Sequence, residues 1–227
     1  MKYQIICDSC GDFTPEMKAD PHFRMVPLSL EIGEYRIMDD EAFDQADFIK
    51  RMATSSIGAK TACPSPEAFQ KAIEESDADE VYIVTLSDQL SGTYQAAKIG
   101  IDLYTESHED SPKKIHLFNS KSASAGECKL CLDIRECKEA GLGFVEVVDI
   151  VEKKCNDIVT VFVLESLETL RKNGRLSAVK SFLASALNIK PVMGAVNGTI
   201  VKLDQQRGIQ KALKRMVQLA VPGVRKR

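Results

Sequence analysis

The sequence predicts an α/β protein in which a parallel sheet with helices on both faces is followed by a smaller α+β domain. Three observations support this prediction. Strand-like and helix-like segments alternate through residues 1–156, which is the pattern of a parallel sheet with crossover helices. The run "VYIVTLS" at 81–87 is apolar almost throughout, as expected for a strand covered on both faces. Residues 157–227 instead hold two β-rich segments around Asn197-Gly198, the strongest hairpin signal in the chain.

The first domain, residues 1–156, contains clear local signals for helices and strands. Ser65 is a typical N-cap, and Pro66 suits the first position of a helix, so a helix should begin there. Pro27 has no N–H group to donate, so the segment around it should be an edge strand or an irregular one. We expect strands at 3–8, 23–33, 81–87 and 114–120, and helices at 44–54, 65–76, 93–105, 124–141 and 144–157.

The second domain, residues 157–227, should have a mixed order of elements. We expect a strand at 158–166, helices at 167–174, 177–188 and 209–221, and two strands around Asn197-Gly198. The first domain carries 17 Lys and Arg against 29 Asp and Glu, a net charge of −12, whereas the second carries 13 against 4, a net charge of +9. This asymmetry indicates either that the second domain faces an anionic partner or that its basic surface is simply solvated and lies against the acidic first domain.

Composition restricts the class of protein. Of the 227 residues, 44% are hydrophobic and 28% are charged, which suffices for a core and is ordinary for a soluble protein. No apolar run approaches the roughly 18 residues that span a membrane, and the N-terminal segment turns polar at Asp8, too early for a signal peptide. We therefore expect a cytoplasmic protein that is not integral to a membrane. Its seven cysteines, an odd number, fit reduced thiols better than a disulfide framework.

Small polar residues follow three of the predicted strands, in "CDSCGD" (7–12), "TLSDQLSGT" (85–93) and "FNSKSASAG" (118–126). The carboxyl ends of parallel strands meet at one edge of a sheet, where ligands bind. Helices follow these loops and also the loop that contains Thr61, and helix N-termini attract anions. Thr61, Ser91 and the amides near Gly92 are therefore candidates to hold a carboxylate or a phosphate. The alternative is that Ser91 or Thr93 only caps its own helix.

Several motifs of catalysis and metal binding are missing from the sequence. There is no phosphate-binding P-loop, no nucleophile elbow around Ser91 and no dinucleotide fingerprint after the first strand. The pairs Cys7/Cys10 and Cys128/Cys131 have a zinc-like spacing, but they lie far apart in the sequence and the second pair falls inside a predicted helix. We therefore assign these thiols to the core and expect no catalytic residue, no metal site and no cofactor.

Seven segments of the chain together resemble the DegV family. In order along the chain they are "CDSCGDFTPE", "KTACPSPEAF", "LSDQLSGTYQAA", "FNSKSASAG", "LETLRKNGRLS", "LNIKPVMGAVNGTI" and "QQRGIQKAL". They occur in the order of the family and cover nearly the whole sequence, and their combination is highly specific.

The resemblance implies a two-domain α/β protein that binds a long-chain fatty acid and is not itself an enzyme. It places the acyl chain in an apolar tunnel between the domains. The carboxylate is then held by Thr61, Ser91 and Gly92, with Arg175 close to that end. A separate fatty acid kinase, using ATP, phosphorylates the carboxylate that the binding protein presents. The predicted helix at 177–188 has apolar residues that suit a tunnel wall, or that simply belong to the core.

The chain departs from the family pattern in its second domain. The family usually continues beyond this point and includes a histidine near the carboxylate, whereas the last histidine here is His116. We expect a truncated second domain whose exposed apolar surface favours self-association.

Two other classes of function remain open at this stage. One is a hydrolase-like enzyme for a small anionic substrate with Ser91 as nucleophile, which lacks a visible base. The other is a nucleic-acid-binding or regulatory protein that uses the basic second domain, but aromatic residues for base stacking are scarce there. We therefore expect no nucleic-acid partner, and a co-purified fatty acid would separate the leading hypothesis from both alternatives.

Overall fold

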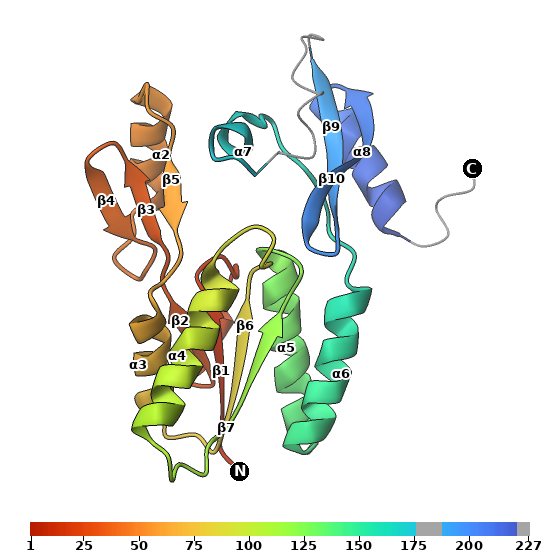
Figure 1. The fold of residues 1–227 in the computed structure, drawn as a ribbon. Helices are drawn as coiled ribbons and strands as arrows, with labels where there is room; N and C mark the ends of the chain where they lie inside the picture. The colour runs from red at the N-terminus through yellow and green to blue at the C-terminus, as the bar shows by residue number, and fades with distance from the viewer. Residues whose placement is uncertain (176–187, 222–227) are drawn as a thin grey trace. The chain divides into compact units, whose positions relative to one another are not determined.

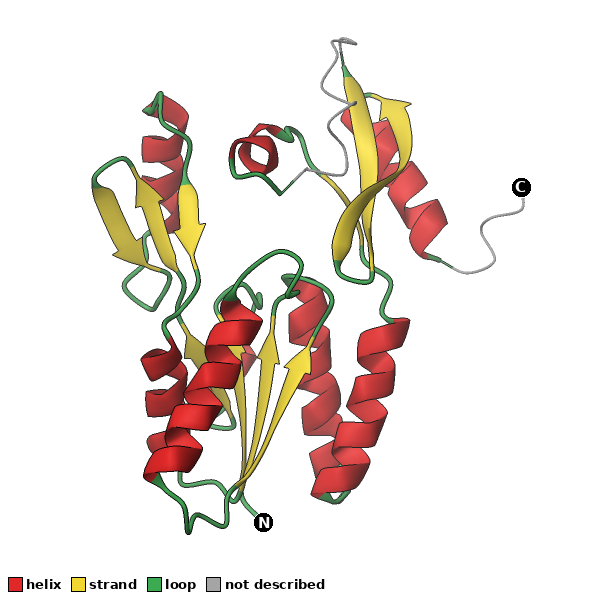
Figure 2. Ribbon diagram, in the orientation of Figure 1, coloured by secondary structure: helices red, strands yellow, loops and turns green. Residues whose placement is uncertain are grey.

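The protein consists of two compact units, Met1–Ile158 and Val159–Arg227 (Figure 1). The structure, a computed structural model, describes residues 1–175 and 188–221. The first unit contains a parallel sheet with helices on both faces and a small antiparallel sheet, and the second contains an antiparallel sheet with helices (Figure 2). The α/β fold class predicted from the sequence is confirmed.

The parallel sheet of the first unit has the strand order β2-β1-β6-β7. Helices α3 and α4 cover one face of it, and α5 and α6 cover the other (Figure 1). All six residues of the central strand β6 are buried, as its apolar run predicted. The bounds are β1 Tyr3–Asp8, β2 Phe23–Val26, β6 Glu80–Thr85, β7 Lys114–Asn119, α3 Pro66–Glu74, α4 Thr93–Ser107, α5 Ala125–Glu139 and α6 Phe144–Asp157.

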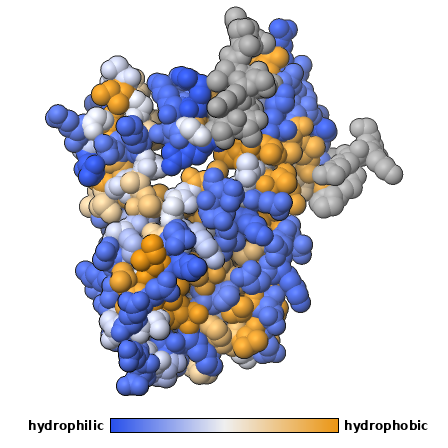
Figure 3. Space-filling model, viewed as in Figure 1, coloured by the Kyte–Doolittle hydropathy of each residue, from blue (hydrophilic) through white to orange (hydrophobic). Residues whose placement is uncertain are grey.

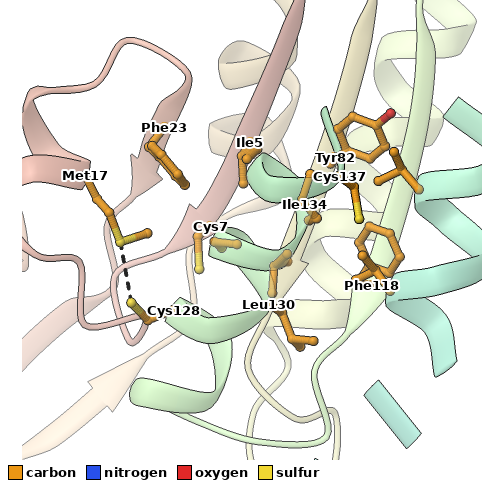
Figure 4. Close-up of a cluster of buried hydrophobic side chains, with 14 of the residues drawn as sticks. Ile5, Cys7, Met17, Phe23, Tyr82, Phe118, Cys128, Leu130, Ile134 and Cys137 are labelled. Atoms are coloured by element: carbon orange, nitrogen blue, oxygen red, sulfur yellow. Dashed lines mark hydrogen bonds between the residues drawn. The ribbon is translucent and has the colours of Figure 1, made fainter. Parts of the chain in front are cut away.

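Each face of this sheet has its own hydrophobic core, because successive side chains of a strand point to opposite faces. Tyr82 and Val84 of β6 belong to the cluster on the α5 and α6 face, shown in Figure 4. Val81 and Ile83 belong to the cluster formed with α3 and α4. Both faces are therefore closed to water, which accounts for the nearly uninterrupted apolar run in the sequence.

A second sheet follows β2 and has the antiparallel order β4-β3-β5. Its strands are β3 Ser29–Ile32, β4 Tyr35–Met38 and β5 Lys60–Ala62, and it packs with α2 Gln45–Thr54 around the buried Phe48. The single strand predicted at 23–33 is therefore wrong. The chain leaves the parallel sheet at Pro27 and enters the antiparallel one two residues later.

Three short elements of the first unit were not expected from the sequence. Strand β4 has only four residues, of which Tyr35 and Ile37 are partly buried, and β5 has three, all of them exposed, so each gives only a weak local signal. Helix α1, Pro15–Ala19, is little more than one turn and buries only Met17. Tertiary pairing, rather than a local pattern, defines these elements.

The second unit is an antiparallel sheet of order β10-β9-β8 with two described helices. Asn197 and Gly198 have positive φ values of 48° and 79° at the turn between β9 and β10, so the predicted hairpin is confirmed. Residues 177–187 of the helix predicted at 177–188 lie outside the described part of the chain, and Asn188 is a turn residue with a φ of 66°. The bounds are β8 Val161–Val163, α7 Glu168–Lys172, β9 Ile189–Val196, β10 Thr199–Arg207 and α8 Ile209–Ala220.

Apolar side chains reach the surface of the second unit. Leu213, Val217 and Val221, on and just after α8, are 37%, 53% and 44% exposed, and the view in Figure 3 shows hydrophobic patches on this unit. Among the helices that the structure describes, none combines the length and the apolar character needed to cross a membrane.

Candidate functional site

Three loops meet at the carboxyl edge of the parallel sheet, as the parallel order requires. The loop after β6 bonds to both of its neighbours: the Leu86 N–H donates to Asp8 Oδ2 at 2.9 Å, and the Ser87 N–H donates to the Ser122 carbonyl at 2.9 Å. The Ser120 N–H in turn donates to the Thr85 carbonyl at 3.1 Å. These bonds hold the three polar loops in fixed positions relative to one another.

Many of the hydroxyls at this edge serve the loops themselves. Ser120 and Ser122 are buried, and the Ser122 N–H donates to Ser120 Oγ at 3.1 Å while Ser120 Oγ donates back to the Ser122 carbonyl at 3.2 Å. Ser9 Oγ accepts from the Leu28 N–H at 3.0 Å, which ties the loop after β1 to the chain beyond β2. The abundance of serine in these loops therefore reflects, in part, the backbone groups that they satisfy.

The turn that leads into α4 leaves donors available to a ligand. Gly92 is the N-cap residue and supplies no side-chain cap. Ser91 Oγ accepts from the Thr93 N–H at 3.3 Å and lies 2.9 Å from Thr93 Oγ1, so Ser91 serves the first helical amide. The next amides, of Tyr94 and Gln95, have no intrahelical acceptor because of their position in the first turn. The turn thus combines partial capping by Ser91 with N–H groups of the kind that bind anions.

Thr61 lies in β5, and the structure brings the end of that strand to the α4 turn. Thr61 is exposed and pairs with Leu30 of β3. Two residues later, the Cys63 Sγ lies 3.5 Å from the position that a Cβ on Gly92 would occupy. The Thr61 loop and the Ser91–Gly92 turn are therefore neighbours within the first unit, although they belong to different sheets and lie about 30 residues apart in the sequence.

Arg175 belongs to the second unit and follows α7. Gly174 has a φ of 73°, which suits the C-terminal stop predicted for this helix. The Arg175 N–H donates to the Leu170 carbonyl at 2.9 Å, and its guanidinium donates to the Asn173 carbonyl, also at 2.9 Å. Of the four predicted ligand-binding residues, three thus lie in the first unit and one in the second.

The first unit also contains a cavity of about 950 Å³ at a different place. It is bounded by the residues after β1, by β2 and by the segment from β4 to α2. Its charged lining is mixed, with Lys18 and Arg24 among the acids Asp12, Asp39, Asp40 and Glu41. The lining includes none of Thr61, Ser91 and Gly92, so this cavity is distinct from the predicted anion-binding turn.

One group of side chains in the described part of the chain has the spacing of metal ligands. Ligand atoms of Asp8, Cys10 and Glu127 all lie within 4.8 Å of one another. The sequence does not reveal this group, because Cys10 and Glu127 are far apart in the sequence and only the cysteine pairs have the spacing of a ligand motif.

These features define an α/β protein with a polar site at the carboxyl edge of a parallel sheet, beside an inserted antiparallel sheet. The chain belongs to the DegV family, because the family model described as an uncharacterised protein of the DegV family matches residues 2–226. A DegV domain-containing protein of Streptococcus pneumoniae is 32% identical over 218 residues, which cover 94% of this chain and 76% of the relative.

Solved structures of the same family resemble this chain closely. A DegV family protein from Ruminococcus gnavus, described with vaccenic acid, is 47% identical with a TM-score of 0.91, and the match covers 97% of this chain and 79% of that one. The fatty acid kinase (Fak) B3 protein of Streptococcus pneumoniae, loaded with linoleic acid, is 31% identical with a TM-score of 0.84 and coverages of 98% and 80%.

Proposed function

We propose that this protein binds a long-chain fatty acid and presents its carboxylate to a separate fatty acid kinase. The observation that supports binding most directly is the 47% identity to a family member described with vaccenic acid, over 97% of this chain. The similarity to the Fak B3 protein, loaded with linoleic acid, supports the link to a kinase. The acyl chain is proposed to lie in an apolar tunnel between the two domains, residues 1–156 and 157–227.

The carboxylate end of the acid is proposed to bind at the α4 turn. The support is geometric: the loop of Thr61 and the turn of Ser91 and Gly92 are neighbours, since Cys63 Sγ approaches Gly92. The first amides of α4 and the partial positive charge of its N-terminus favour an anion there. Hydroxyls of Thr61 and Ser91 then add charge-assisted hydrogen bonds to the carboxylate.

The test is a fatty acid titration of the double variant Thr61→Ala/Ser91→Ala. A hydrogen bond to a charged group is worth about 1.5–3 kcal/mol, so losing two should weaken binding by about two orders of magnitude or more. Fluorescence displacement of a bound fatty acid probe measures the affinity, and denaturing mass spectrometry of an organic extract identifies any acid that co-purifies.

The matched control is Thr54→Ala/Thr105→Ala, which also removes two hydroxyls from the first unit. Both hydroxyls are exposed and donate only to carbonyls of their own helices, so affinity should stay as in the wild type. Wild-type affinity in the Thr61→Ala/Ser91→Ala variant would reject this carboxylate site.

Arg175 is proposed to bind the carboxylate, or the acyl phosphate that the kinase forms from it. Its place just after Gly174 lets the chain turn away from α7, and a guanidinium offers a planar set of donors that match a carboxylate or phosphate. The alternative is a salt bridge between the domains, for which charge alone suffices.

The Arg175→Lys variant separates these two roles because it keeps the charge and removes the bidentate fork. We expect acyl phosphate formation with the cognate kinase to fall by about tenfold or more, which corresponds to about 1.4 kcal/mol, while the far-ultraviolet spectrum is unchanged. Arg207→Lys, an exposed site in the same unit, is the control. Wild-type turnover of Arg175→Lys would exclude a role in head-group recognition.

The structure offers little support for a hydrolase with Ser91 as nucleophile. Each of the three histidines is engaged elsewhere: His22 with Asp20 at 2.7 Å, His116 with Glu152 at 2.9 Å, and His108 with the Tyr104 carbonyl at 3.1 Å. Ser91 Oγ lies 2.9 Å from another hydroxyl, that of Thr93. A serine nucleophile needs an adjacent base, and the histidines do not provide one.

A further inference from the structure

Asp8, Cys10 and Glu127 form a compact donor cluster that the proposed function does not use. Asp8 ends β1, Cys10 lies in the loop that follows, and Glu127 lies in the first turn of α5. Asp8 and Glu127 are both fully buried, and Cys10 is partly exposed. The carboxylate oxygens and the thiol sulfur lie within 4.8 Å of one another.

The backbone holds these side chains in place. Asp8 Oδ1 accepts from the Cys10 N–H at 3.0 Å, and Asp8 Oδ2 accepts from the Leu86 N–H at 2.9 Å. Glu127 Oε1 accepts from the Ser124 N–H at 2.9 Å as part of the capping box of α5. Outer hydrogen bonds of this kind fix the orientation of carboxylate ligands in metal sites, so the cluster is already ordered by the fold.

The two acids of the cluster lack the cationic partner that the other buried acids of the described chain have. Glu80 pairs with Lys138 at 2.7 Å, and Asp133 pairs with Lys129 and Lys154. By contrast, no described Lys, Arg or His lies within ion-pair distance of the two acids of the cluster, Asp8 and Glu127. Buried charges are normally paired or bound to a metal.

Burial disfavours the charged form of both carboxyl groups. Burial raises the pKa of Asp8 to about 6, and burial together with the charge of Asp8 raises the pKa of Glu127 well above its ordinary value. A bound divalent cation would offset the charge of both carboxylates and satisfy the same oxygens.

We propose that Asp8, Cys10 and Glu127 bind a zinc ion. Two carboxylates with a thiolate are a donor set that suits zinc, whereas calcium and magnesium prefer oxygen alone. Zinc lies about 2.0–2.2 Å from oxygen and about 2.3 Å from sulfur, so ligand atoms that lie up to 4.8 Å apart must move closer together to share one ion.

Three protein ligands leave the fourth tetrahedral position to a water molecule. The partial exposure of Cys10 gives the ion a route to this position. On binding, the Cys10 thiol and any protonated carboxyl group release their protons to solvent. The ion then joins the first loop of the chain to α5, two segments that the sequence separates by more than a hundred residues.

The first test is a competition titration with a chromophoric zinc chelator on the full chain, after metal has been removed. We expect one zinc ion per chain. Cys10→Ser and Glu127→Gln, each close in size to the native residue, should weaken zinc binding by at least about tenfold. The control Cys155→Ser removes a buried thiol of α6 that is not part of the cluster and should bind zinc as the wild type does.

The second test uses cobalt as a spectroscopic substitute for zinc in the wild-type chain, and so does not depend on the folding of a variant. A thiolate-to-cobalt charge-transfer band in the near ultraviolet is expected, and it should be absent in Cys10→Ser. The proposal is overturned if the wild type binds no stoichiometric zinc, if its cobalt complex lacks this band, or if the folded Cys10→Ser and Glu127→Gln variants both bind zinc as tightly as the wild type.

Discussion

The two units bury their strands in different ways, and the contrast appears when β6 is compared with β10. All six residues of β6, in the first unit, are buried between two layers of helices. Of the nine residues of β10, in the second unit, only Ile200 is buried. A parallel sheet with both faces covered gains more apolar burial per residue than an antiparallel sheet covered by helix α8. The first unit should therefore tolerate fewer changes than the second.

The same contrast holds for charge. Glu80 and Lys138 of the first unit form an ion pair whose side chains are 1% and 9% exposed, and Tyr82 adds a hydroxyl donor to Glu80 at 3.0 Å. Asp204 and Arg215 of the second unit form a pair at 2.5 Å whose side chains are 29% and 36% exposed. When one partner of a buried pair is removed, the other charge stays buried without compensation. In an exposed pair, water solvates the charge that remains.

The largest effect is therefore expected from Lys138→Met. The variant keeps most of the apolar stem but leaves Glu80 buried without its cation, so the free energy of unfolding should fall by about 3–5 kcal/mol. Urea denaturation followed by circular dichroism measures the change. The counterpart Arg215→Met should cost at most about 1 kcal/mol, and similar losses in the two variants would remove the contrast between the units.

A second, smaller effect is expected from Gly100→Ala, which tests how tightly the helices of the first unit pack. A Cβ at this position of α4 would lie 2.5 Å from the Pro66 carbonyl oxygen and 2.7 Å from Phe69 Cβ, both in α3. Because α3 and α4 would have to separate, the loss should be about 1–3 kcal/mol. Lys98→Ala, on the exposed side of the same helix, should stay within about 0.5 kcal/mol of the wild type. An unchanged Gly100→Ala variant would mean that the helices separate freely.

The smallest effect is expected in the second unit, from Gly198→Ala. The φ of 79° at this turn position disfavours any residue with a Cβ, at a cost of about 1–2 kcal/mol. Hydrogen exchange of the β9 and β10 amides should become faster, while exchange in β6 stays unchanged. Asn197→Gly, which relaxes the neighbouring positive φ of 48°, is the control and should leave exchange as it is. Faster exchange in both units would indicate that they unfold together.

Local signals in the sequence predicted much of the fold. The apolar run of β6 gave a doubly covered strand, the Ser65-Pro66 pair gave the start of α3, and Asn197-Gly198 gave the hairpin of the second unit. The small antiparallel sheet was not foreseen, because β5 has no buried residue and Pro27 looked like an irregularity within one strand rather than a passage between two sheets.

The candidate site was predictable only as far as topology determines it. Parallel order places the loops after β1, β6 and β7 at one edge, whatever their side chains are. The approach of Cys63 to Gly92 depends on where the inserted sheet packs, and the cluster of Cys10 with Glu127 depends on how α5 packs against β1. Contacts of this kind, between segments that are distant in the sequence, leave no periodic pattern to read.

The inserted sheet has a consequence for how the chain is organised. Its first and last paired residues, Ser29 and Ala62, stand opposite each other in adjacent antiparallel strands, so the excursion begins and ends at neighbouring points about 4.5–5.5 Å apart. It is thus an appendage attached by two adjoining connections, and replacing it with a tight turn would leave the strand order of the parallel sheet intact. Because Thr61 pairs with Leu30 inside this excursion, any tilt about those connections carries Thr61 with it as part of one sheet.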